Sequence, residues 1–263
     1  MREESQKAGK RLLDVLSLHW YPEARDPNGV RICFDGENNT SPEMRYARMQ
    51  APRTLWDPTY KTTQKGQITA GENSWINQWF PEYLPILTNI INDINTYYPG
   101  TKLAITEFDY GGRNDISGGI ALVDVLGIFG KYGVYLATRW GDSGTYAKSA
   151  YNIYLNYDGK GSKYGDTCVK AETTDVENLP VYSAIHGESD NKLHIIIINR
   201  NLDKVGKVSI VINNASKNYS TSVIYGFDYS SPEIRKMGEV NNIQNNSFQI
   251  NIPPLTVYHL VLE

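Results

Sequence analysis

Three short apolar segments, separated by long stretches that include helical periodicity, constrain the fold of this chain most. The segments span residues 12–18, 102–108 and 134–140. Apolar residues recur at helical spacing in the stretches 81–98 and 118–132, which precede the second and third segments. Strands joined by crossovers of this length pair in parallel, because antiparallel neighbours need only short turns. We therefore predict a parallel α/β sheet in the first part of the chain.

The pattern changes after a Gly/Lys/Asp-rich stretch at 158–166. From Leu179 onward, apolar and polar residues alternate with a period of two, and short polar turns, such as 188–191, separate the segments. The clearest of these segments are 193–199, 208–212, 222–225, 248–252 and 256–262. This alternation is typical of an antiparallel sheet or half-sandwich. We predict an α/β part at 1–165, followed by an all-β domain at 166–263.

Charge and cysteine content exclude several classes of function. The formal net charge is −3, and no dense Lys/Arg run is present, so we expect no nucleic-acid partner. No apolar run approaches the length of a membrane span, and the first residues lack the apolar core of a signal peptide. Cys33 and Cys168 are too few for a disulfide framework and lack metal-ligand spacing, so we expect both thiols to be free.

The chain is rich in aromatic residues, with 19 tyrosines and 5 tryptophans. Aromatic rings that have an apolar face and a polar tip suit sugar rings, which expose C–H bonds on one side and hydroxyls at the rim. Tyrosine is also common in β-rich cores, and that second interpretation stays open.

Functional groups of a parallel sheet collect where the strands end. Glu107 lies at such an end, with apolar residues before it and glycines after it. A carboxylate fixed there can attack an anomeric carbon or bind a metal. The alternative is an ion pair with Arg113 or Arg139, and spacing alone does not separate these interpretations.

Aromatic residues and one histidine near the strand ends are candidates for substrate contacts. Trp75 and Trp79 are four residues apart, so a helical turn would place both indoles on one face, as a sugar platform or as a loop anchor. Trp140 ends the third strand. The remaining candidates are His19 and Tyr21, at the end of the first strand and able to orient a carboxylate, and Tyr110 after the second.

The motifs at residues 13–22, 105–112 and 139–142 resemble those of glycoside hydrolase family 44, and the resemblance covers essentially the whole chain. It implies endo-β-1,4-glucanase or xyloglucanase activity on β-glucan, with a TIM-like barrel beside a β-sandwich. It also implies a retaining mechanism with Glu107 as the nucleophile, and a substrate cleft lined by Trp75, Trp79 and Trp140. No cofactor is implied for the chemistry. Relatives are described with bound calcium, whose ligands the sequence does not place.

The chain departs from the family in one respect that concerns catalysis. The resemblance makes its strands the last three of an eight-stranded barrel, whereas the family's acid/base glutamate belongs to an Asn-Glu dipeptide after the fourth strand. The sequence has no Asn-Glu dipeptide. Glu23, near the end of the first strand, is the only other nearby candidate for the acid/base, and nothing in its context supports that role. A whole barrel needs about 250 residues, which is more than precede the β-rich part. We therefore expect a truncated chain that is inactive alone.

Several expectations follow from truncation. Three parallel strands cannot close, so the fragment should associate, and a missing N-terminal half of the barrel is a candidate partner. The parent enzyme is expected to be secreted. The alternatives to an enzyme fragment are a non-catalytic carbohydrate-binding protein and a truncated product that has no function.

Overall fold

The computed structural model describes residues 1–60 and 74–263. The chain divides into two compact units, residues 1–112 with 125–142 and residues 113–124 with 143–263. The residues of the long helix α5 (Ile116–Lys131) are divided between the two. The predicted domain boundary at 165 stays a prediction.

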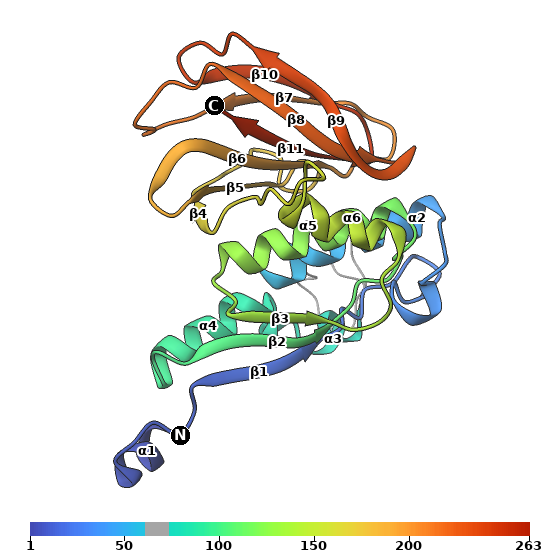
Figure 1. Cartoon of the computed structure of the whole chain (residues 1–263). Helices are drawn as coiled ribbons and strands as arrows, with labels where there is room; N and C mark the ends of the chain where they lie inside the picture. Colours follow the sequence, from blue (N-terminus) through green and yellow to red (C-terminus); the bar gives the residue numbers. More distant parts are fainter. Residues whose placement is uncertain (61–73) are drawn as a thin grey trace. The chain divides into compact units, whose positions relative to one another are not determined.

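The first unit is built on a three-stranded sheet. Its strands are β1 (Val15–Trp20), β2 (Lys102–Phe108) and β3 (Leu136–Arg139), in the order β1-β2-β3 (Figure 1). Both strand pairs are parallel, as the sequence predicts. The unit's other elements are the helices α1 (Arg2–Ala8), α2 (Pro42–Gln50), α3 (Trp75–Trp79) and α4 (Ile86–Tyr97), and the 3-10 turns η1 (Phe34–Gly36), η2 (Ala51–Leu55) and η3 (Pro81–Tyr83).

The central strand β2 carries the core of this unit. Leu103, Ile105 and Phe108 are buried, and the Phe108 ring meets that of Phe129 from α5 at 5.2 Å between centroids, edge to face. A parallel strand covered on both faces needs a nearly continuous apolar run, which explains why this segment is so clear in the sequence. Packing of this kind fixes the backbone from which Glu107 projects.

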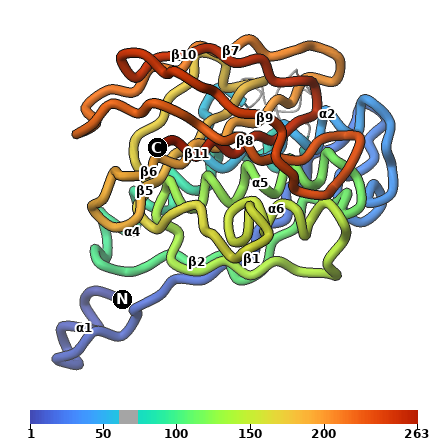
Figure 2. The backbone as a smooth tube through the Cα atoms, turned by 45° about the horizontal axis from the view of Figure 1, so that its top comes forward, coloured from blue at the N-terminus to red at the C-terminus, as the bar shows by residue number. Residues whose placement is uncertain are grey.

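The second unit contains antiparallel sheets. Its strands are β4 (Thr167–Val169), β5 (Val181–His186), β6 (Ser189–Asn199), β7 (Gly206–Val211), β8 (Thr221–Asp228), β9 (Ser231–Asn241), β10 (Ser247–Ile252) and β11 (Thr256–Leu262). Six form a sheet in the order β4-β5-β6-β11-β8-β9, and β10 pairs with β7, beside which it runs in Figure 2. Residues of both sheets, including Ile195, Leu260 and Phe248, share one apolar core.

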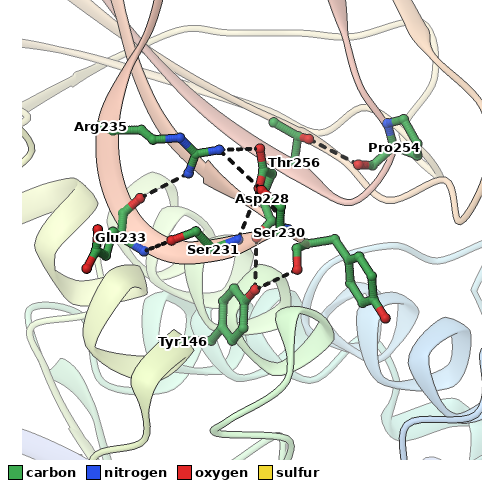
Figure 3. A network of polar contacts seen from close by, with 9 residues as sticks. Tyr146, Asp228, Ser230, Ser231, Glu233, Arg235, Pro254 and Thr256 are labelled. Carbon is green, nitrogen blue, oxygen red and sulfur yellow. Dashed lines mark hydrogen bonds and ion pairs between the residues drawn. The ribbon is translucent and has the colours of Figure 1, made fainter.

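A polar network joins helix α6 (Thr145–Leu155) to the turn between β8 and β9 (Figure 3). The hydroxyl of Tyr146 lies 2.9 Å from the carbonyl oxygen of Asp228 and 3.1 Å from that of Tyr229, to which it donates. The Asp228 carboxylate accepts from the backbone of Ser230 and binds Arg235 at 2.6 Å. These contacts lower the pKa of Asp228 against the opposing effect of its burial. The network thus anchors the turn to helix α6.

None of the helices in the described residues combines the length and apolar character that a membrane crossing requires.

Candidate active site

The carboxyl ends of the three parallel strands place His19, Tyr21, Glu107 and Trp140 at one edge of the sheet. Strand β2 has one extra residue there: Leu18 of β1 pairs with Ile105, but His19 pairs with Glu107. The register between β2 and β3 slips over the same residues. A bulge of this kind changes the direction of side chains and is frequent next to active sites. It aligns Glu107 with the end of β1.

Two side chains of the first strand hold the Glu107 carboxylate. The Tyr21 hydroxyl donates to Oε2 at 3.0 Å, and Nδ1 of His19 lies 3.2 Å from the same oxygen. Neither contact involves Oε1. The Glu107 side chain is 30% exposed, so the group is oriented by its neighbours and still reaches solvent. One carboxylate oxygen is thus anchored while the other can meet a ligand.

Tyr21 is held as a hydrogen-bond donor. Burial and the hydrogen bond to Glu107, followed by the negative charges of Glu107 and Asp109, raise the pKa of Tyr21 to about 12. The phenol therefore keeps its proton at any physiological pH, and it donates to the carboxylate throughout that range.

Arg139, one of the two alternative partners considered for Glu107, pairs with a different carboxylate. Arg139 binds Oδ1 of Asp109 through Nη2 at 2.8 Å and Nε at 3.1 Å. Both side chains are nearly buried, at 8% and 12% exposure. Glu23 is likewise engaged by Arg25 and Arg31. Guanidinium groups therefore pair with Asp109 and Glu23. The contacts described for Glu107 come instead from a phenol and an imidazole.

The tryptophan candidates are exposed. Trp75 and Trp79 begin and end a short helix, α3, and Ser74 caps it by accepting from the Asn77 backbone at 3.2 Å. Their exposed fractions are 48% and 51%. Trp140 is 58% exposed, and its backbone N–H donates to the Phe108 carbonyl at 3.0 Å. Sugar binding by these residues stays a prediction.

Tyr110 differs from the other candidates because it is buried, with 3% of its surface exposed. Its proposed substrate contact stays a prediction.

The described residues contain no group of three or more His, Cys, Asp or Glu side chains arranged to hold a metal ion. Cys33 and Cys168 are free thiols, and burial raises the pKa of Cys33 to about 12.

The sequence interpretation missed one aromatic residue of this region. Phe34 is 55% exposed, and its ring centroid lies 5.6 Å from that of Tyr21. Spacing gives no sign of it, because Phe34 lies in a loop of irregular pattern. The only available signal was an apolar ring between Cys33 and the polar dipeptide Asp35-Gly36.

Comparison with known proteins gives a consistent set of relatives, although no protein-family model matches. The chain is 68% identical over 253 residues to a β-mannanase/endoglucanase A of Caldicellulosiruptor saccharolyticus, covering 96% of this chain and 19% of that protein. The structure matches Cel44A, a family 44 endoglucanase of Clostridium thermocellum, with a TM-score of 0.91 and 52% identity. It also matches a family 44 xyloglucanase of Paenibacillus polymyxa with xyloglucan, with a TM-score of 0.90 and 46% identity. Both matches cover 100% of this chain and 49% of the solved one, so the chain spans about half of each.

Proposed function

This chain is homologous over its whole length to enzymes of glycoside hydrolase family 44, and from that we propose that it supplies the nucleophile for hydrolysis of internal β-1,4-glucosidic linkages. The substrate would be a cellulose-like glucan or xyloglucan. The observation that best supports Glu107 as the nucleophile is that Tyr21 and His19 hold its carboxylate through Oε2 at the strand ends.

The proposed chemistry follows from this geometry. The free oxygen of Glu107 attacks the anomeric carbon, and the bond from that carbon to the leaving oxygen breaks with its electron pair. The glycosyl ester is then hydrolysed by water with net retention of configuration. The hydrogen bond from Tyr21 and the contact with His19 fix the carboxylate in the attacking orientation.

The fold is part of the proposal. We propose that β1, β2 and β3 are the last strands of a (β/α)8 barrel and that the antiparallel sheets of the second unit form a β-sandwich. A retaining enzyme needs a second carboxyl about 5 Å from the first, to protonate the leaving oxygen. We propose that this acid/base belongs to a preceding half of the barrel and that this chain alone does not turn over polymer. Since a glucan polymer cannot enter a cell, the parent enzyme would act outside it.

Glu107 can be tested without the missing acid. A 2-deoxy-2-fluoro-β-cellobioside with a 2,4-dinitrophenolate leaving group needs no protonation, and the fluorine slows breakdown of the ester. We expect the chain to gain one fluoro-cellobiosyl mass on the peptide that contains Glu107, and the Glu107→Gln variant to gain none. Glu23→Gln is the matched control and should still be labelled.

Two results would contradict the assignment. Labelling of another residue, with Glu107→Gln labelled as fast as the unmodified chain, would remove Glu107 from the chemistry. Binding of cello-oligosaccharide without any labelling would favour a carbohydrate-binding protein that does not cleave its ligand.

A further inference from the structure

The turn that carries Phe34 has an unusual backbone. Phe34 begins η1 with φ of 60°, in the left-handed region that a bulky side chain rarely adopts. Such a conformation costs free energy and persists only where the surroundings impose it. The packing of the residues on either side of Phe34 shows what imposes it here.

Three groups fix this turn from both sides. Arg48, fully buried, donates to the carbonyl oxygens of Ile32 at 3.3 Å and Gly36 at 2.6 Å, which flank Phe34. A Cβ on Gly36 would lie 2.1 Å from the Arg31 carbonyl oxygen, so only glycine fits. A Cβ on Gly111, just after β2, would lie 2.2 Å from the Ile32 oxygen. The loop after Glu107 therefore packs directly against the backbone that presents Phe34.

The ring that this turn presents faces solvent. It is 55% exposed and meets Tyr21 with an interplanar angle of 37°. The Arg31 guanidinium carbon lies 5.0 Å from its centroid, and Arg31 is itself tied to Glu23. A left-handed backbone at a bulky residue costs free energy in the free protein. Packing of a ligand on the exposed ring would offset part of that cost.

We propose that Phe34 is a binding contact for the sugar unit next to Glu107, with its ring packed against the C–H face of a pyranose. The chemistry of the surroundings indicates this ligand class: an apolar ring beside the Tyr21 phenol and the Arg31 guanidinium matches a molecule with an apolar face and a hydroxyl rim. The inference rests on the proposed function, because Tyr21, which touches the Phe34 ring, also donates to the Glu107 carboxylate.

The test measures the affinity of this chain for cellohexaose and for a xyloglucan heptasaccharide by calorimetry. Phe34→Gly removes the ring and relieves the left-handed strain, since glycine adopts positive φ freely. We expect binding roughly tenfold weaker, from the apolar area no longer buried on the sugar. Phe34→Trp should keep most of the affinity. Tyr97→Ala is the control: it removes a ring that is 69% exposed at the end of α4, and it should bind as the unmodified chain does.

The outcomes separate this inference from the proposed function. If Phe34→Gly binds both sugars as tightly as the unmodified chain, while Glu107 is still labelled by the fluoro-glycoside, the Phe34 contact is wrong and the proposed function stands. If the unmodified chain binds neither sugar and is not labelled, both are wrong. Circular dichroism of Phe34→Gly checks that a loss of affinity is not a loss of fold, and Phe34→Ala provides a second ring deletion.

Discussion

At the scale of single residues, the site depends on one hydrogen bond more than on any local motif. Tyr21 and Glu107 are 86 positions apart, and the hydroxyl reaches the carboxylate only because β1 and β2 pair in parallel with a bulge at the last step. The bond fixes a negatively charged oxygen, and hydrogen bonds to charged groups are the stronger kind. The hydrogen bond should therefore affect the pKa of the Tyr21 phenol.

We predict that Tyr21 titrates well above an ordinary tyrosine and that Glu107→Gln lowers its pKa. The phenolate is disfavoured by burial, by loss of the hydrogen bond it donates, and by the adjacent negative charge, and the substitution removes the charge. With ¹³C-labelled tyrosine, the Tyr21 signal, assigned by Tyr21→Phe, should stay at the phenol position to about pH 11. An unchanged midpoint in Glu107→Gln would show that the two side chains do not interact in solution.

At the scale of elements, the second unit contains a buried histidine pair that joins helix α6 to the sheet. Nδ1 of His259 on β11 lies 3.1 Å from the carbonyl oxygen of Ile153 on α6 and must donate to it. In the neutral ring Nε2 is then an acceptor, so Nδ1 of His194 on β6 donates to it at 3.0 Å. Both side chains are fully buried, and burial lowers the pKa of His194 to about 4 and that of His259 well below its ordinary value.

We predict that this pair makes the fold sensitive to acid. Both folded-state pKa values lie below the unfolded value near 6.5, so the unfolded chain binds more protons between these values. Stability is therefore complete at neutral pH and falls as the pH drops from about 6.5 toward 4, with His194 alone costing about 2 kcal/mol by pH 5. Urea unfolding at pH 7.5 and pH 5 measures this loss.

The His194→Leu variant tests whether the histidine pair causes this loss of stability. His194→Leu should lose less stability between the two pH values than the unmodified chain, whatever its absolute stability. Equal losses in His194→Leu and the unmodified chain would show that the pair does not govern the acid response.

The elements also show where sequence reasoning works. Strand β2 was predicted with its observed limits, Lys102–Phe108, because a buried parallel strand needs a continuous apolar run. Strand β9 was missed. It lies at the edge of the six-stranded sheet and carries Pro232, Glu233 and Arg235, residues that edge strands tolerate and that blur the alternation. Helix α6 was missed because its Tyr-rich sequence has weak helix propensity, and packing on β8 and β9 stabilises it.

In the site as well, some features follow from strand topology and others depend on tertiary packing. Glu107, Tyr21 and His19 were found because chemistry at strand ends follows from topology. Their mutual contacts, and the choice of Asp109 as the partner of Arg139, depend on a bulge and on side-chain directions that spacing does not encode. Phe34 depends on a left-handed turn imposed by residues far along the chain, Arg48 and Gly111.

At the scale of the whole molecule, the three-stranded sheet has two open edges. Within the described residues, β1 and β3 each pair only with β2, so their outer backbone groups are available for pairing. Large apolar side chains are exposed along and beside β3, among them Tyr135, Leu136 and Trp140. Open parallel edges with exposed apolar residues favour association with further strands. The chain spans about half of each solved relative.

We predict that this chain, purified alone, sediments as a mixture of associated species and releases no reducing sugar from xyloglucan. Co-expressed with the preceding half of a family 44 endoglucanase, it should form a single one-to-one complex that cleaves the polymer, because in our proposal that half would supply further strands and the proton donor. Glu107→Gln in the same complex should assemble equally well and lose at least about 10³-fold in rate, since assembly needs the strand edges and cleavage needs the carboxylate. Polymer cleavage by the unmodified chain alone would show that it contains its own acid, and a fully active Glu107→Gln complex would show that another group is the nucleophile.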